Sequence, residues 1–313
     1  MPLSIEYLKK HYIKKTIFEI ENHTIQVNQK PMVTVLLITY QHFDFIDSAI
    51  QGILKQKFNQ EWEIIIGDDN STDGTKEICL KYAKMYPDKI RFFQHHDENK
   101  RKILNRPCGI FQYAYNFLHA RGKYISVCSG DDVWTDPRKL QKQFDFMELH
   151  KNVSLSYHSF QEKYINQDGS FYFGIERNNF PKASTTFFIN IKNELSKKFI
   201  HVIQEDEFLY FILRRKGTFE HLFSVKPAII NTPVTSITRS MSKKERVKQV
   251  LNLNEYIFVS YIFSKYSWQA LKKLLGTWKQ IIFLKNEKVS GRFVLVILIN
   301  SFINIMLKAL NIK

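Results

Sequence analysis

The sequence predicts an α/β fold in which helices cover a mostly parallel, mixed β-sheet. Apolar runs of strand length alternate with amphipathic runs of helix length, the connections are short, and residues 32–39 (MVTVLLIT) lack polar alternation. A strand without alternation is typical of a parallel sheet that is covered on both faces. Alternating strands and helices favour βαβ units, whose right-handed crossovers make a sheet parallel.

The first half of the chain predicts three strands joined by two helices. After residues 32–39, apolar positions recur at helical spacing over 44–57, and basic residues end this segment, as suits a helix carboxyl terminus. A second strand is predicted at 61–69, a helix at 72–86 and a third strand at 89–94. We therefore expect the carboxyl ends of these strands at one edge of the sheet.

The second half predicts further helices and strands that make the sheet mixed. Pro107 suits the first turn of a helix, because its missing N–H has no helical partner there. Basic residues 214–216 are expected to close the last helix before Gly217. The expected elements are a helix at 107–121, a strand at 122–132, a helix at 138–150, a strand at 152–160, a hairpin through Asn166–Gly169, a strand at 183–189 and a helix at 205–217.

Length and charge suggest one large domain with appendages. The chain has 313 residues, and we predict an N-terminal extension over 1–31, a main domain over 32–240 and a basic helical tail over 241–313. The formal net charge is +16, and the tail holds 13 Lys or Arg against 3 Asp or Glu. Nucleic acid, anionic lipid and a diphosphate-bearing substrate all suit such a surface, and charge alone does not choose among them.

The cysteines and the amino terminus indicate a reducing compartment. Cys79, Cys108 and Cys128 are an odd set without CxxC spacing, which favours neither a disulfide framework nor a zinc cluster. Residues 1–15 contain no apolar run of the length that a signal peptide needs. We therefore expect a cytoplasmic protein.

Adjacent carboxylates follow two of the predicted strands. Asp68 and Asp69 precede the turn NSTDGT, where an Asx turn or a helix cap explains an acidic residue equally well. Asp131 and Asp132 follow an apolar strand, where neighbouring carboxylates repel each other unless a cation or hydrogen-bond donors offset their charge. Mg²⁺ and Mn²⁺ bind through one or two carboxylates together with substrate phosphates. The second pair therefore indicates a metal site that a nucleoside diphosphate completes.

Two segments carry these features in an order and spacing that resemble glycosyltransferase family 2: VTVLLITYQHFDFIDSAIQGILKQKFNQEWEIIIGDDNSTDGT and GKYISVCSGDDVWTDPRKLQKQ. The resemblance is close from Val33 to Phe160 and looser up to residue 240. It implies the GT-A fold, a Rossmann-like, mostly parallel mixed sheet flanked by helices. It also implies an inverting glycosyltransferase that uses a nucleotide-activated sugar and Mn²⁺ or Mg²⁺.

The resemblance assigns roles to individual residues. Asp69 would accept a hydrogen bond from the nucleotide base, because a base edge in a buried pocket needs its donors paired. Asp132 would be the metal ligand in a DXD-like motif with Asp131. Thr39 and Tyr40 would line the base and ribose pocket, so the residues expected to bind the nucleotide sugar are Thr39, Tyr40, Asp69 and Asp131.

A downstream acidic run offers the catalytic base. Inverting transfer needs a carboxylate that takes the proton of the acceptor hydroxyl. The segment QEDEFLYFIL supplies Glu205, Asp206 and Glu207 at a predicted helix start, and the resemblance assigns the base to Asp206. Acidic residues in a first helical turn are also favoured by the helix dipole alone, and Glu205 and Glu207 remain rivals for the role.

One position departs from the family pattern. Many relatives carry a His after a Tyr-Arg pair downstream of the base, where it completes the metal ligands. Here the corresponding stretch retains Arg239 but has Met241 near the expected His. A thioether is a poor ligand for Mg²⁺ or Mn²⁺, so either another group replaces it or metal binding is weakened.

Other polar residues receive no site. His95 and His96 favour a solvated strand end over a metal cluster. The basic residues 100–102 with Arg106 suit either a diphosphate contact or a solvated loop. In the tail, residues 293–307 are apolar but shorter than a membrane span, and a polar stripe suits a helix lying in a membrane interface or packed on protein.

The leading prediction is a sugar transferase for surface polysaccharide or lipid-linked glycan synthesis. By resemblance, the donor is a uridine diphosphate sugar and the acceptor is a hydroxyl of a glycan or lipid-linked molecule. An anionic membrane surface on the inner face of the cell membrane is a further expected partner, whereas nucleic acid is not expected. The alternatives are a nucleotidyltransferase, which lacks support from a glycine-rich phosphate loop, and a non-enzymatic binder of nucleic acid or anionic surfaces.

Overall fold

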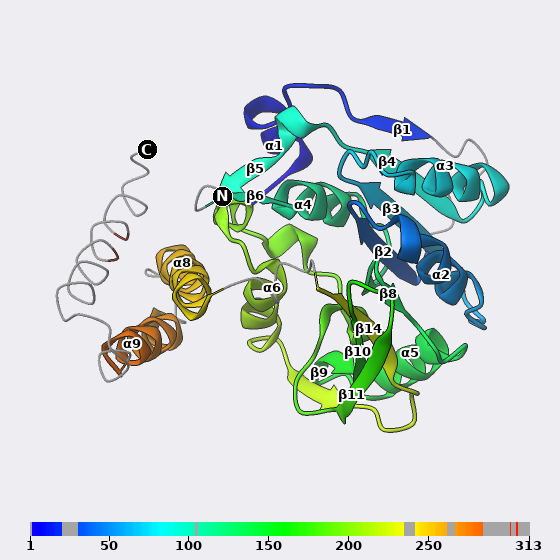
Figure 1. The fold of residues 1–313 in the computed structure, drawn as a ribbon. Helices are drawn as coiled ribbons and strands as arrows, with labels where there is room; N and C mark the ends of the chain where they lie inside the picture. Colours follow the sequence, from blue (N-terminus) through cyan, green and yellow to red (C-terminus); the bar gives the residue numbers. More distant parts are fainter. Residues whose placement is uncertain are drawn as a thin grey trace.

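A central eight-stranded sheet organises the molecule (Figure 1). The computed structural model describes residues 2–20, 31–103, 106–234, 242–261, 267–283, 301 and 305. The strand order of the central sheet is β1-β4-β3-β2-β7-β12-β9-β13. Its strands are β1 (Phe18–Ile20), β2 (Val33–Thr39), β3 (Trp62–Asp68), β4 (Ile90–Gln94), β7 (Tyr124–Ser129), β9 (Val153–Tyr157), β12 (Phe187–Ile189) and β13 (Thr218–His221).

The four strands in the middle of this sheet are parallel, as predicted. β2 pairs with β3 on one side and β7 on the other, and β3 pairs with β4. Every residue of β3 is buried, which explains why its sequence shows an unbroken apolar run instead of alternation. The order of these strands brings the ends of β3 and β7 to either side of the end of β2.

The sheet becomes mixed beyond β7, which confirms the predicted fold class. β12 is antiparallel to both β7 and β9, and β13 is parallel to β9. A second sheet has the order β11-β10-β14-β8, and its antiparallel strands β10 and β11 form the hairpin predicted at Asn166–Gly169. Its strands are β8 (Asp132–Val133), β10 (Phe160–Ile165), β11 (Phe171–Arg177) and β14 (Ala228–Pro233).

Helices cover both faces of the central sheet. Along β2, the side chain of Leu36 packs with one buried cluster, whereas Val35 and Leu37 pack with the other, as the two faces of a strand require. Helices α2 (Phe43–Leu54), α3 (Thr75–Met85) and α5 (Lys139–Leu149) lie on the Val35 face. Helices α1 (Ile5–His11), α4 (Ile110–His119) and α6 (Glu205–Leu213) lie on the Leu36 face.

Two predicted elements are wrong at their starts. Pro107 does not open a helix: Arg106–Cys108 forms β6, which pairs with β5 (Arg101–Ile103), and α4 begins only at Ile110. The strand predicted at 183–189 begins with a 3₁₀ turn, η2 (Ala183–Thr185), and only its second half is the strand β12. In the first case pairing with the neighbouring strand β5 overrides the helix signal, and in the second case hydrogen bonds between the Lys182 backbone and Thr185 form the turn.

The predicted extension and tail both contact the main domain. β1 pairs with β4, and Leu8 of α1 is fully buried in the Leu36-face cluster. Two tail helices are described, α8 (Lys243–Tyr261) and α9 (Ser267–Phe283). Within the described residues, we find no helix with the length and apolar character needed to cross a bilayer. Residues 21–30 of the extension and most of 293–307 lie outside the described residues, and the domain limits at 32 and 240 remain predictions.

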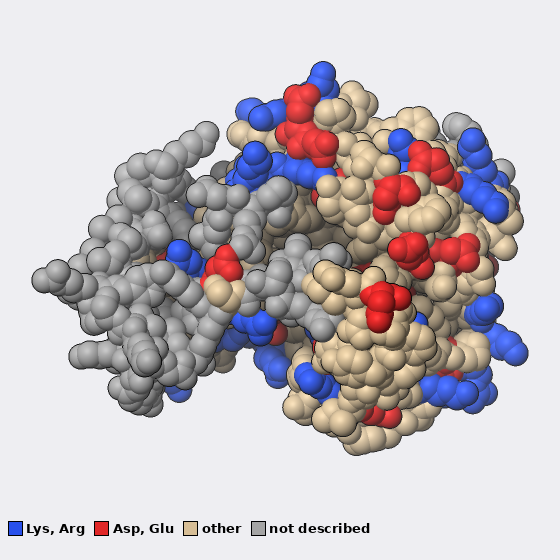
Figure 2. All heavy atoms as spheres, in the orientation of Figure 1, with Lys and Arg blue, Asp and Glu red and all other residues tan. Residues whose placement is uncertain are grey.

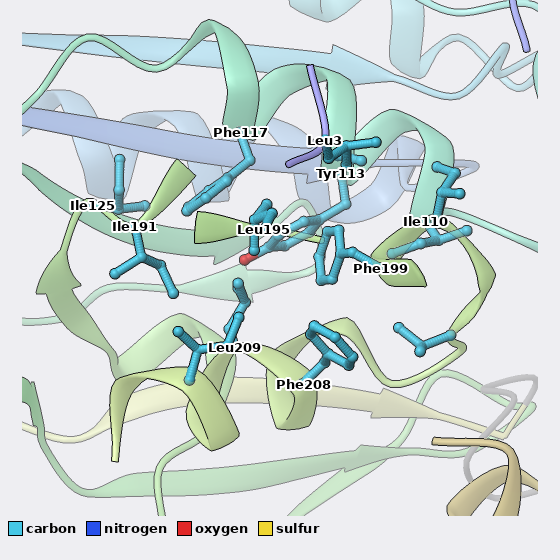
Figure 3. Close-up of a cluster of buried hydrophobic side chains, with 14 of the residues drawn as sticks. Leu3, Ile110, Tyr113, Phe117, Ile125, Ile191, Leu195, Phe199, Phe208 and Leu209 are labelled. Carbon is cyan, nitrogen blue, oxygen red and sulfur yellow. The ribbon is translucent and has the colours of Figure 1, made fainter. Parts of the chain in front are cut away.

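Aromatic and aliphatic side chains from Leu3, α4, α6 and the segment 191–199 lie together in the core of the Leu36 face (Figure 3). Phe117 of α4 is fully buried there, and its ring lies 6.3 Å from that of Phe188 on β12. This core joins α6, which carries the predicted base, to the sheet that carries the other predicted residues.

Truncating this core side chain is expected to weaken the fold strongly. Phe117→Ala leaves a cavity in a packed interior, so the free energy of unfolding should fall by about 3–5 kcal/mol. Phe171→Ala is the matched control, because Phe171 is 54% exposed, and its effect should stay within about 0.5 kcal/mol. Urea denaturation measures both. A small loss for Phe117→Ala would contradict the described packing.

Candidate active site at the carboxyl ends of the sheet

The structure brings the predicted strand-end residues to one edge of the sheet. The last residues of β2 and β3, Thr39 and Asp68, are register partners, and Ile38 is the register partner of Ser129 at the end of β7. Asp69 follows β3 directly, and its backbone N–H donates to the Thr39 carbonyl at 3.0 Å. Asp131 and Asp132 follow β7 after one glycine. Residues separated by about 90 positions in sequence thus share one edge.

Asp69 is buried and lies beside a lysine. The residue is 6% exposed, and its Oδ2 lies 3.9 Å from Nζ of Lys100, which also contacts Asp97 Oδ1 at 2.7 Å. The Lys100 ammonium lies 3.9 Å from the centre of the Tyr40 ring. Burial raises the pKa of Asp69 to about 7, and the charge of Lys100 opposes that increase.

The turn after β3 is held by other acidic residues. The Ser71 backbone N–H donates to Asp68 Oδ2 at 2.9 Å. Asp73 accepts hydrogen bonds from the N–H and hydroxyl of Thr75, the first residue of α3. The Asx-turn and capping explanation therefore applies to Asp68 and Asp73, and the Asp69 carboxyl points instead toward Lys100.

The second carboxylate pair is held by hydroxyl groups. The hydroxyl of Ser184, in η2, donates to Asp132 Oδ2 at 2.5 Å, and the Ser129 hydroxyl donates to Asp131. His42 Nε2 lies 3.8 Å from Asp131 Oδ2. Burial, followed by the charge of Asp131, raises the pKa of Asp132 well above its usual range. A cation beside this pair would offset both effects.

The donor set fits a hard divalent cation that a substrate completes. Asp131 and Asp132 offer carboxylate oxygens, the ligands that Mg²⁺ and Mn²⁺ prefer. Within the described ranges, no group of three or more His, Cys, Asp or Glu side chains is placed to hold a metal ion. The described residues therefore offer only part of a coordination shell here, and phosphate oxygens and water are the further ligands that Mg²⁺ usually takes.

Asp206 lies in the first turn of α6, and the charge of one lysine, Lys182, acts on both Asp206 and Asp132. The positive charge of Lys182 lowers the pKa of both carboxyls, so its ammonium is within electrostatic range of each. Lys182 immediately precedes η2, which carries Ser184, the hydrogen-bond donor to Asp132. The net pKa of Asp206 is nevertheless raised by burial, and that of Glu205 is raised to about 8 by burial and by the charge of Asp206.

Several residues of this edge were not identified from sequence. His42, Lys182 and Ser184 carry no motif of their own, and only contacts across the fold reveal them. Lys100 could have been suspected from the sequence, because it begins the basic run for which a contact with a diphosphate was one explanation. The solvated strand end expected at His95 is wrong: His95 is 1% exposed, and its Nε2 lies 3.1 Å from Asn116 Oδ1.

The departure at Met241 lies outside the described residues, as does Arg239. The roles assigned to Thr39, Tyr40, Asp69, Asp131, Asp132 and Asp206 remain predictions, although the fold places the first five at one edge of the sheet.

Comparisons with known proteins agree with this architecture. Residues 34–223 match the profile of Glycosyl transferase family 2. The putative teichuronic acid biosynthesis glycosyltransferase TuaG of Bacillus subtilis is 26% identical over 269 residues, which is 85% of this chain and 95% of TuaG. An uncharacterized protein of Mycobacterium tuberculosis is 31% identical over 170 residues, or 54% of this chain, and the matched part spans 44% of that relative's length.

A solved structure shows the same fold. Residues 1–349 of Staphylococcus aureus TarS, in complex with UDP-GlcNAc, align with a TM-score of 0.55 and 14% identity, over 88% of this chain and 81% of that chain.

These matches define the class of protein as a glycosyltransferase of the GT-A type. The family profile covers more than half of the chain, so the chain belongs to glycosyl transferase family 2. The predicted family, fold and enzyme class are therefore confirmed.

The buried Asp69 should give the protein a measurable pH dependence of stability. Its pKa is about 7 in the fold against 3.8 ordinarily, so the native state favours the protonated form, and stability falls as pH rises from 3.8 to about 7 and is level above that. Asp69→Asn removes this loss. Its gain in unfolding free energy should be larger at pH 8 than at pH 5, by up to about 3 kcal/mol.

Urea denaturation at the two pH values measures this difference. Asp88→Asn, which changes an exposed carboxyl in a turn, is the control. An equal effect of Asp69→Asn at both pH values would show that Asp69 titrates as an ordinary carboxyl.

Proposed function

We propose that the chain is a metal-dependent, inverting transferase that moves a sugar from a uridine diphosphate sugar to a hydroxyl group. The observation that supports this most directly is the common edge at which Asp69, Asp131 and Asp132 meet, with Asp206 sharing the charge of Lys182. A nucleotide pocket, a cation site and a base are the three parts that such a transfer needs.

The nucleotide would bind between Tyr40, Asp69 and Lys100. Uracil presents an N–H at its base-pairing edge, and an ionised Asp69 can accept that hydrogen bond. Lys100 favours the ionised form, since its charge lowers the pKa of a carboxyl that burial raises. The half-exposed Tyr40 ring offers an apolar surface beside the same carboxyl.

Asp132, together with Asp131, would hold a divalent cation. When bound, the cation would neutralise charge that develops on the departing diphosphate. The protein prepares this position through Ser184, which keeps the buried Asp132 oxygen hydrogen-bonded, and through His42, which borders Asp131. Burial and the neighbouring Asp131 make ionisation of Asp132 costly, and this arrangement favours a cation over an additional anion.

Asp206 would act as the general base. Its carboxyl lies at a helix start, and burial raises its pKa, which increases its affinity for a proton from the acceptor hydroxyl. Lys182 opposes that increase, so the carboxyl can still be ionised before the reaction. Glu205 and Glu207 lie in the same helical turn and provide natural comparisons.

The acceptor class follows from relatives and from charge. TuaG carries a teichuronic acid biosynthesis name, which supports an acceptor that is a growing surface polysaccharide or its lipid-linked precursor. The positive charge of the chain suits an anionic membrane surface nearby. Over the described part of the face in Figure 2, Lys and Arg lie mainly toward the margins and are interspersed with acidic side chains, which does not favour a nucleic-acid groove there.

The nucleotide and metal parts of the proposal can be tested together by calorimetry. UDP is expected to bind wild type more tightly with Mn²⁺ than without it, and Asp132→Asn should lose that metal-dependent increase while still folding. Asp88→Asn is the matched control, because it removes an equal charge far from any predicted role. Wild type that stays folded yet ignores UDP with and without Mn²⁺ would sink the proposal.

The base can be separated from its acidic neighbours by kinetics. Asp206→Asn should lower kcat by about 10²–10⁴-fold, because the acceptor hydroxyl loses its proton acceptor, while UDP affinity stays near wild type. Glu205→Gln and Glu207→Gln should retain most activity. If Glu205→Gln shows the large loss and Asp206→Asn does not, the base is Glu205.

A further inference from the structure

The N-terminal segment 2–20 is tied to the loop that carries Lys100. The link is Asn99, which is 2% exposed. Its Oδ1 accepts hydrogen bonds from the backbone N–H groups of Lys14 at 2.8 Å and Lys15 at 3.0 Å, and its Nδ2 donates to the Lys15 carbonyl at 2.7 Å. One buried amide therefore uses both ends of its side chain to bind two successive residues of the segment.

The residue on the other side of Lys100 is held by the same segment. The Arg101 guanidinium lies 4.8 Å from the centre of the Tyr12 ring, and its Nη2 lies 3.3 Å from His201 Nδ1. The Tyr12 hydroxyl lies 3.3 Å from the other ring nitrogen of His201. Lys100 thus stands between two residues that both contact the N-terminal segment.

A third contact fixes the strand that leads into this loop. β1 of the segment pairs with β4, and Glu19 Oε1 accepts a hydrogen bond from Arg91 Nη2 at 3.0 Å. β4 ends at Gln94, the short turn η1 (Asp97–Asn99) follows, and Lys100 is the next residue. The segment therefore contacts this part of the chain before the turn, within it and after it.

A lysine ammonium needs an anchored backbone to hold one position, because its side chain is flexible. The Lys100 side chain is only 11% exposed and reaches both Asp97 and Asp69. We propose that segment 2–20 is a positioning element that, through Asn99, holds the Lys100 ammonium against Asp69. That Lys100 and Asp69 bind a nucleotide rests on the proposed function, whereas the contact between the two side chains does not.

The first test uses no ligand. Carboxyl-carbon NMR follows the titration of Asp69 in wild type, Lys100→Met, Asn99→Ala and the double variant. Lys100→Met should raise the pKa of Asp69, because a nearby positive charge is lost. Asn99→Ala should raise it in the same direction. The double variant should show no more than the Lys100→Met shift, because Asn99 acts through Lys100.

The controls separate positioning from general damage. Glu98→Gln changes the same turn and removes an exposed pair with Lys15 at 3.9 Å, so it should leave the Asp69 titration unchanged. Asn99→Ser keeps a neutral hydrogen-bonding group at this position and should give a smaller shift than Asn99→Ala, and it serves if the alanine variant folds poorly. A wild-type Asp69 titration in Asn99→Ala, or additive shifts in the double variant, would overturn the inference.

A second measurement distinguishes this inference from the proposed function. Lys100→Met should weaken UDP binding by about tenfold, and Asn99→Ala should weaken it in the same direction without a further loss in the double variant. If wild type does not bind UDP while the NMR shifts occur, the proposed function fails and the positioning role stands. If wild type binds UDP and Asn99→Ala changes neither readout, the positioning role is wrong.

Discussion

The hydrogen-bonded register of β3, β2 and β7 is the constraint on which the rest of the structure depends. Parallel strands lie about 4.8 Å apart, so three that end level with one another place the residues after them within about 10 Å. Here the register pairs Thr39 with Asp68 and Ile38 with Ser129. Gly130 permits the close approach, because a Cβ there would lie 2.4 Å from Thr39 Oγ1. This register therefore keeps the pair Asp68 and Asp69 close to the pair Asp131 and Asp132.

Burial gives this edge its electrostatic character. Asp69, Asp132 and Asp206 each have a pKa that burial raises, and each lies near a lysine that opposes the increase. The charge of Lys100 lowers the pKa of Asp69, and the charge of Lys182 lowers the pKa values of Asp132 and Asp206. Carboxylates that are costly to ionise in the protein alone are well matched to cationic or proton-donating ligands, because binding such a ligand removes part of the cost of ionisation. The same energetic argument therefore supports the proposed roles of Asp69 in binding the nucleotide base, of Asp132 in binding the metal and of Asp206 in accepting a proton.

The parts of the fold that could be predicted are those in which local sequence and burial agree. β2 and β3 are apolar throughout because both faces are covered, and this pattern is visible in the sequence. Pro107 shows the opposite case. Its position suited a helix start, but residues 106–108 pair with β5, a few residues upstream, and the basic residues of that short strand carry no apolar strand pattern. The first half of the segment 183–189 is likewise a 3₁₀ turn, in which Ser184 reaches Asp132.

The sequence by itself determined the strands, their parallel arrangement and the acidic residues that follow them, because apolar runs and strand-end carboxylates are local features. It also showed the family, since several motifs recur in order. Only the tertiary structure decided which cations and hydroxyls meet those carboxylates. Lys182 and Ser184 lie far along the chain from Asp132, and nothing in the sequence around them indicates that Ser184 donates to Asp132 or that the charge of Lys182 reaches it. The same holds for the N-terminal segment, whose purpose depends on the buried side chain of Asn99, because a hydrogen bond between distant segments exists only after folding brings both together.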